Sequence, residues 1–145
     1  MIRYLKRLFR TLRDWVTSSE LSEEVASSEP LSRFIYQSNH FNANTKKINS
    51  SAFLPPPNRE LSVFRIFRLG DSEIWEIGNT IRAKPTKARA DVVAGKIQQA
   101  GLTVIPETSA HVRHANIVGW PETKHEQKVF AIKLSQAATL KLPLA

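Results

Sequence analysis

The first sixteen residues place hydrophobic side chains at steps of three and four positions. The hydrophobic stripe consists of Ile2, Leu5, Leu8, Leu12 and Trp15, and basic residues occupy many of the remaining positions. This spacing predicts an amphipathic helix, and the interspersed arginines argue against a secretory signal. The stripe has three interpretations: it packs on its own domain, it binds a protein partner or a second copy through residues 2–16, or, as a lesser alternative, it lies on a membrane surface.

Charge changes sign abruptly within the N-terminal segment. Residues 1–13 carry five bases and no acid, whereas residues 14–29 carry five acids and no base. The acidic stretch is rich in Ser and Glu, which is typical of a linker or a frayed helix. We therefore predict that residues 1–29 form a basic amphipathic helix plus an acidic linker or second helix. Residues 30–145 are predicted to form a compact basic domain.

The hydrophobic pattern of residues 30–145 alternates between strand-like and helix-like periods. It predicts a short helical turn at 31–37, strands at 61–68, 80–83, 102–106 and 114–120, and helices at 71–78, 87–100 and 124–140. The Asn- and Pro-rich residues 38–60 predict a long loop. The expected fold class is α+β: a small sheet of three or four strands packed against two long helices, preceded by the N-terminal amphipathic helix.

Two local signals fix the ends of the predicted helices. Gly101 stands where a left-handed residue would end the helix at 87–100. Thr123 is followed three residues later by Glu126, which is the pattern of a capping box at the start of the last helix.

Composition narrows the class of protein. At 145 residues the chain has room for one domain and a short appendage, and it contains no Cys. Disulfide scaffolds, thiolate metal sites and Cys nucleophiles are therefore excluded, and a cytoplasmic location is expected. Lys and Arg outnumber Asp and Glu by 21 to 13, giving a formal charge of +8. That surplus favours an anionic partner such as nucleic acid or another phosphate-bearing molecule.

A cluster of bases near the predicted helix at 87–100 is the main candidate for anion binding. The candidate phosphate-binding residues are Arg82, Lys84, Lys87, Arg89, Arg113, Lys124 and Lys128, with Trp120 as a stacking platform for a base. Backbone N–H groups at a helix start would add to the attraction for phosphate. The competing interpretation is a solvated basic face with Trp120 in the core. Nucleic-acid binding, with the N-terminal helix used for assembly, is the leading functional hypothesis.

Three histidines support an alternative hypothesis. His111 and His114 lie close together with an arginine between them, and the loop carrying His40 could supply a third imidazole. A metal-independent phosphoryl-transfer or nuclease-type enzyme needs an acid, a base and a cation, which such a set provides. These residues can equally be ordinary loop and strand side chains.

Cofactor and metal sites are not predicted. Gly-rich phosphate loops, dinucleotide fingerprints and HExxH motifs are all missing from the sequence. A third hypothesis, a non-catalytic adaptor subunit with an incidental basic face, therefore stands beside binding and catalysis.

Overall fold

The computed structural model describes residues 21–144, so the predicted helix at 2–16 lies outside the described residues. The elements are, in chain order, β1 (Pro30–Ile35), the 3-10 turn η1 (Ser38–His40), β2 (Phe41–Asn42), β3 (Lys47–Ile48), the 3-10 turn η2 (Ser50–Phe53), β4 (Leu61–Arg65), α2 (Asp71–Ile81), β5 (Ala88–Val93), α3 (Ala94–Gln99), β6 (Thr103–Pro106), β7 (His114–Val118), α4 (Lys124–Ala137) and β8 (Thr139–Lys141).

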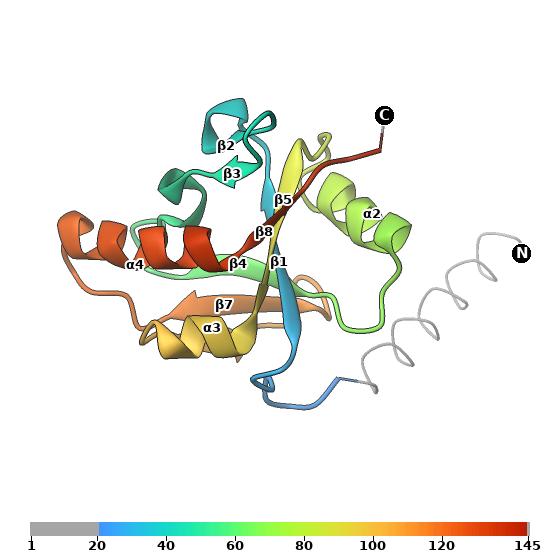
Figure 1. Cartoon of the computed structure of the whole chain (residues 1–145). Coiled ribbons are helices and arrows are strands. Elements are labelled where there is room, and N and C mark those ends of the chain that lie inside the picture. The colour runs from blue at the N-terminus through green and yellow to red at the C-terminus, as the bar shows by residue number, and fades with distance from the viewer. Residues whose placement is uncertain (1–20, 145) are drawn as a thin grey trace, which may run out of the picture.

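One large sheet organises the molecule. Six strands pair in the order β6-β7-β4-β1-β5-β8, every pair antiparallel, and β2 pairs with β3 in a separate two-stranded sheet. Figure 1 shows α3 and α4 on one side of the large sheet and α2 on the other. The fold is α+β, but the prediction of a three- to four-stranded sheet against two long helices is wrong. The described residues form only three α-helices, of which α3 has six residues.

The error at 87–100 has a clear physical cause. Its apolar residues fit a helical stripe, but residues 88–93 form β5 and only 94–99 form α3. In the strand, Ala88 and Ala90 are fully buried on one face, while Arg89 and Asp91 point to the other. There Nε of Arg89 lies 3.3 Å from Oδ2 of Asp91. All six residues of β5 pair with β1. The strand pairing outweighs the helix preference of alanine, because tertiary context overrides propensity.

Two other sheet strands were not predicted. A helical turn was expected at 31–37, but residues 31–35 form most of β1, which lies between β4 and β5. The predicted end of the last helix, 139–141, instead forms β8 against β5. The predicted strand at 80–83 is wrong in the opposite sense, since α2 continues to Ile81.

The predicted loop at 38–60 contains two 3-10 turns and the short β2–β3 hairpin. Asn42 accepts hydrogen bonds from the N–H groups of Asn44 (2.9 Å) and Thr45 (3.1 Å), which builds the turn between β2 and β3. Phe53 at the end of η2 is completely buried and anchors the segment against the main core. Burying such a side chain contributes about 1.5–3 kcal/mol relative to leaving it exposed.

Two hydrophobic clusters lie on the two faces of the sheet. The larger includes residues of the sheet, α3, α4 and η2, and the smaller consists of Phe34, Phe64, Ile66 and Ile74, the last on α2. Gly78 lets α2 approach β1 closely, because a Cβ at this position would lie only 2.6 Å from Cδ1 of Phe34.

Two of the predicted helix termini, at Gly101 and at Thr123, match the structure. Gly101 has φ +95°, as expected for a left-handed residue after a helix. At the start of α4, the Thr123 hydroxyl accepts from the Glu126 N–H at 3.2 Å and donates to the Glu126 carboxylate at 2.8 Å.

Candidate functional site

Arg89 lies inside the protein and is already paired. Its Nη2 is 2.8 Å from Oδ1 of Asp71, and its Nε is 3.3 Å from Oδ2 of Asp91. The guanidinium also stacks 4.8 Å from the ring centre of Trp75. With two carboxylates and an aromatic face around it, this cation stabilises the contact between β5 and α2.

Arg113 and Trp120 are also buried. Arg113 donates from Nη1 to the carbonyl oxygens of Arg65 (3.0 Å) and Phe67 (2.8 Å), tying the segment before β7 to the end of β4. Trp120 is 4% exposed and donates from Nε1 to the carbonyl oxygen of Ile117 at 2.9 Å. Both side chains serve the fold in this structure, and neither presents a surface to a ligand.

The remaining predicted bases are exposed but fall into two groups. Lys124 and Lys128 lie on the first half of α4, on the opposite side of the sheet from α2 (Figure 1). Arg82, Lys84 and Lys87 lie between the end of α2 and the start of β5. The structure therefore does not gather all the predicted bases into one patch.

The Tyr36 ring contacts two of the basic side chains that follow α2. The Arg82 guanidinium and the Lys84 ammonium lie 5.1 and 5.2 Å from the centre of the Tyr36 ring, both within cation–π distance. The Tyr36 hydroxyl donates to the carbonyl oxygen of Gly78 in α2. Burial raises the pKa of Tyr36 above its usual value. The phenol is therefore a neutral platform for the two cations.

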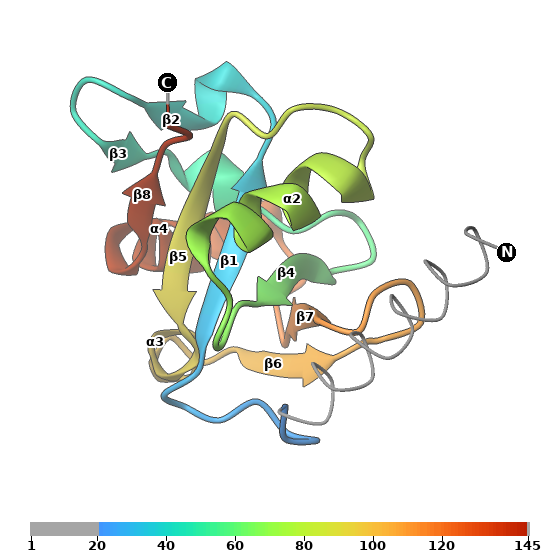
Figure 2. The same cartoon turned by 90° about the vertical axis from the view of Figure 1, so that its right-hand side faces the viewer.

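Three segments that are distant in sequence meet at this end of the sheet. Ile35 pairs with Ala88, and Arg89 pairs with Lys141. The β2–β3 hairpin follows β1 after η1 and packs against β8. Figure 2 shows the hairpin, the end of β8 and the start of β5 at the same end of the molecule. We call this surface the basic end and define it by its exposed bases: Lys46, Lys47, Arg82, Lys84, Lys87 and Lys141.

The segments that carry the basic end contain no acidic residue, and Asp91 of β5 attracts Lys141 from outside them. Residues 36–48, 80–88 and 139–144 contain no Asp or Glu. Within the described residues, none of its six bases forms a salt bridge. These exposed bases therefore carry a net positive charge at the surface, which attracts anions.

Arg33 adds positive potential from beneath the same end. It donates from Nε to the carbonyl oxygen of Ala52 (3.0 Å) and from Nη1 to that of Ser62 (2.9 Å). Burial, followed by repulsion from Arg82, lowers the pKa of Arg33 to about 10. Burial, followed by repulsion from Arg33, also lowers the pKa of His40. Burial is thus the main cause of both shifts, and repulsion between neighbouring cations adds to it.

The candidate histidines, like the candidate bases, lie in two separate places. His111 and His114 both flank the ring of Phe64, with ring centres 5.6 and 5.3 Å from it. His40 lies in η1, beyond the end of β1, whereas His114 begins β7. The structure thus brings two of the three histidines together.

His114 lies within a hydrogen-bonded group that the sequence did not reveal. Its Nε2 is 2.7 Å from Oγ of Ser62, and its Nδ1 is 2.7 Å from the carbonyl oxygen and 3.2 Å from Oε2 of Glu107. Bonds from Ser109 and then from His114 lower the pKa of the Glu107 carboxyl. Ser62 and Glu107 are 45 residues apart, and no sequence motif links them, so only strand pairing could identify the group.

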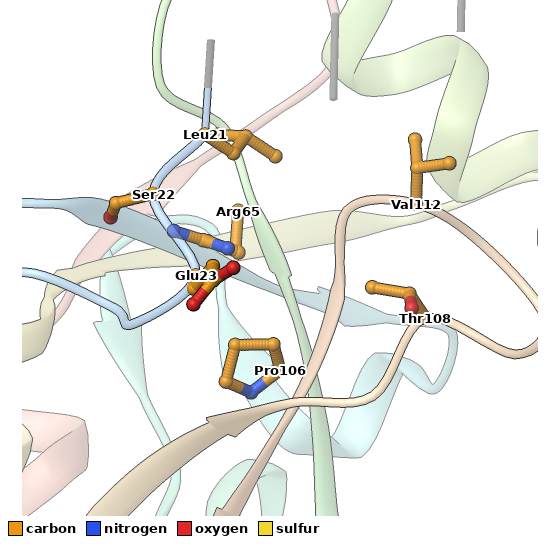
Figure 3. A pocket seen from close by; sticks show the side chains of 7 residues that line it. All are labelled: Leu21, Ser22, Glu23, Arg65, Pro106, Thr108 and Val112. Atoms are coloured by element: carbon orange, nitrogen blue, oxygen red, sulfur yellow. The ribbon is translucent and has the colours of Figure 1, made fainter. Parts of the chain in front are cut away.

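A pocket of about 440 Å³ lies near the start of β1, at the end of the sheet opposite the basic end. Figure 3 shows side chains from three parts of the chain around it, with Thr108 and Val112 on one side. Its lining residues are Leu21, Ser22, Glu23, Arg65, Pro106, Thr108 and Val112. Arg65 is paired with Glu29 at 2.8 Å, so its charge is already satisfied, and the lining does not specify a ligand.

Within residues 21–144, no three His, Asp or Glu side chains are grouped so that they could hold a metal ion. Over the same range, no helix has both the length and the apolar character needed to cross a bilayer. The chain matches no protein-family model, and no curated protein or solved structure shows a significant match to it.

Proposed function

We propose that this protein binds nucleic acid through the basic end. The observation that carries the proposal is the convergence of six exposed bases from three segments that contain no acid. Phosphate contacts by Lys and Arg supply most of the affinity in sequence-independent nucleic-acid binding, because they release condensed counterions. The basic end provides such contacts without first having to break internal salt bridges.

The mode of recognition follows from Tyr36. Its ring is occupied by Arg82 and Lys84, and its hydroxyl is bonded to Gly78, so it holds cations in position. Trp120 is buried, which leaves it unable to stack on a base. The proposed contacts are therefore with the phosphate backbone, which positions a nucleic acid without reading its sequence.

The test compares two double variants of the full chain that remove equal charge. Arg82→Gln/Lys84→Gln alters the basic end, and Lys124→Gln/Lys128→Gln alters α4. Binding of a labelled single-stranded RNA and of a duplex DNA is measured by anisotropy from 50 to 200 mM salt. The wild type should weaken steeply with salt, and each lost phosphate contact should reduce the log–log slope by about 0.7–0.9.

The two variants give distinct outcomes. The proposal requires that Arg82→Gln/Lys84→Gln weakens binding and reduces the slope, while the α4 variant stays close to wild type. Equal losses in both variants would mean that net charge alone attracts the nucleic acid. That result, or binding that does not change with salt, would overturn the assignment to the basic end.

A further inference from the structure

We infer that Ser62 is a nucleophile activated by His114 and that this pair cleaves carboxylic esters. The inference is independent of nucleic-acid binding, since it concerns β4 and β7 rather than the basic end. It begins from the 2.7 Å hydrogen bond between the Ser62 hydroxyl and Nε2 of His114. A nucleophile bonded to a base, with the base oriented by a third group, is the general arrangement for serine catalysis.

The third group sets the tautomer of the imidazole. A backbone carbonyl oxygen only accepts hydrogen bonds, so the 2.7 Å contact to the Glu107 carbonyl places the proton of neutral His114 on Nδ1. Nε2 then carries the lone pair and accepts from the Ser62 hydroxyl. The Glu107 carboxylate, 3.2 Å from Nδ1, stabilises the imidazolium that forms when His114 takes a proton. Glu107 is thus a positioning residue for the base.

The strand register adds a hydrogen-bond donor beside the nucleophile. Asn116 in β7 lies directly across from Ser62 in β4, so both side chains point to the same face of the sheet. Paired residues of this kind have Cβ atoms about 4.5–5.5 Å apart. The Asn116 side chain makes no hydrogen bond to any described residue, which leaves its amide free to donate to an oxyanion formed at Ser62.

The surface around Ser62 is partly exposed and partly apolar. Ser62 and Asn116 are partly exposed, and the neighbouring Ile105, which pairs with Asn116, is 49% exposed. Ile105 lies next to Asn116 on the side away from Ser62. An exposed apolar side chain one strand beyond the amide donor suits an ester whose acyl group is a hydrocarbon chain.

The reaction would proceed in two balanced steps. As the Ser62 Oγ attacks the ester carbonyl carbon, its proton passes to Nε2 of His114. The resulting oxyanion accepts a hydrogen bond from the side-chain N–H of Asn116. The bond to the alcohol oxygen then breaks, the alcohol takes the proton from Nε2, and an acyl-Ser62 remains. Water attacks this acyl group, gives a proton to His114, and releases the carboxylic acid. The same proton returns to the Ser62 oxygen.

The first experiment is covalent labelling of the full chain with an alkyl fluorophosphonate, read by intact mass and peptide mapping. Attack by Ser62 forms an oxygen–phosphorus bond and expels fluoride. We expect one adduct per chain at Ser62, none with Ser62→Ala, and a rate about 10²–10⁴-fold lower with His114→Gln, which is the usual contribution of a general base. Ser72→Ala and His125→Gln change exposed residues of α2 and α4 and should label like wild type.

Hydrolysis of p-nitrophenyl butyrate by the same variants supplies the second readout, with Asn116→Ala expected to slow acylation. Should Ser62→Ala fail to fold, Ser62→Cys gives the chain its only thiol, and its alkylation rate should fall when His114→Gln is added. Wild-type protein that gains no adduct at Ser62 would overturn the inference. A thiol whose reactivity does not depend on His114 would also overturn it.

Discussion

Glu29 and Arg65 form an ion pair in the interior, with side chains only 7% and 3% exposed. The Glu29 carboxylate accepts hydrogen bonds from both Nε and Nη2 of Arg65, the latter at 2.8 Å. Glu29 immediately precedes β1, and Arg65 ends β4, so the pair closes the junction between two central strands. Such bidentate bonds align the two groups as well as attract them.

Removing one partner should therefore be much more costly than removing both. Glu29→Ala leaves the Arg65 cation buried, and we expect a loss of about 3–5 kcal/mol in the free energy of unfolding. Glu29→Met/Arg65→Met replaces the pair by apolar groups of similar length and should recover most of that loss. Urea denaturation of both variants measures the difference. Equal destabilisation by the two variants would show that the buried charge is not the cause.

Gly78→Ala is expected to destabilise the protein even though alanine favours helices over glycine by about 1 kcal/mol. The new Cβ would lie 2.6 Å from both Phe34 and Thr86, so α2 would have to move away from β1. Overpacking of this kind costs about 1–3 kcal/mol. Thermal unfolding tests the prediction, with Gly70→Ala as a control, because the nearest atom there is a flexible Glu73 side chain at 3.4 Å. An increase in Tm for Gly78→Ala would contradict the close packing.

The elements that sequence reasoning located carry strong local signals. The Thr123–Glu126 capping pair and Gly101 are determined by bonds within a few residues, and both are present. β5 and β8 depend on partners distant in sequence. The alanines of β5 fit a helical stripe, and the three residues of β8 follow α4 so closely that the predicted last helix extends into them. Local patterns could therefore identify these two helix termini but not the number of strands.

The same distinction applies to the candidate sites. Sequence proximity correctly brought His111 and His114 together, and it grouped Arg82 with Lys84. Sequence proximity also assigned Arg89 to the same basic surface as Arg82 and Lys84, because the bases were grouped by their positions along the chain. In β5 the Arg89 side chain points to the face of the sheet that α2 covers. There it pairs with Asp71, which lies 18 residues away in sequence. Only the register of β5 could reveal this.

Arg89→Gln should accordingly affect stability rather than nucleic-acid binding. The variant leaves Asp71 and the partly buried Asp91 without their cation and removes the guanidinium from the Trp75 ring. Hydrogen bonds to charged groups contribute about 1.5–3 kcal/mol, so a clear fall in the denaturation midpoint is expected. Affinity for RNA, measured where the variant is folded, should match wild type. A stable variant with weakened binding would return Arg89 to the binding surface.

Acidification should weaken the fold through His40. Burial and the nearby Arg33 hold the pKa of His40 below its ordinary value of 6.5. The unfolded chain therefore binds a proton at His40 at higher pH than the folded chain does. Stability from this group is fully present above about pH 6.5 and is lost as the pH falls toward the lowered pKa of the folded state.

The measurement is the urea midpoint of wild type and His40→Gln between pH 7.5 and 5.0. The wild type should lose stability relative to the variant across this interval, because glutamine does not titrate.

A polyanion bound at the basic end offsets the charge of Arg33 and so favours the imidazolium form of His40. Nucleic acid should then bind more tightly as the pH falls, and His40→Gln should reduce that increase. Parallel stability curves for the two proteins would show that His40 is not the group responsible.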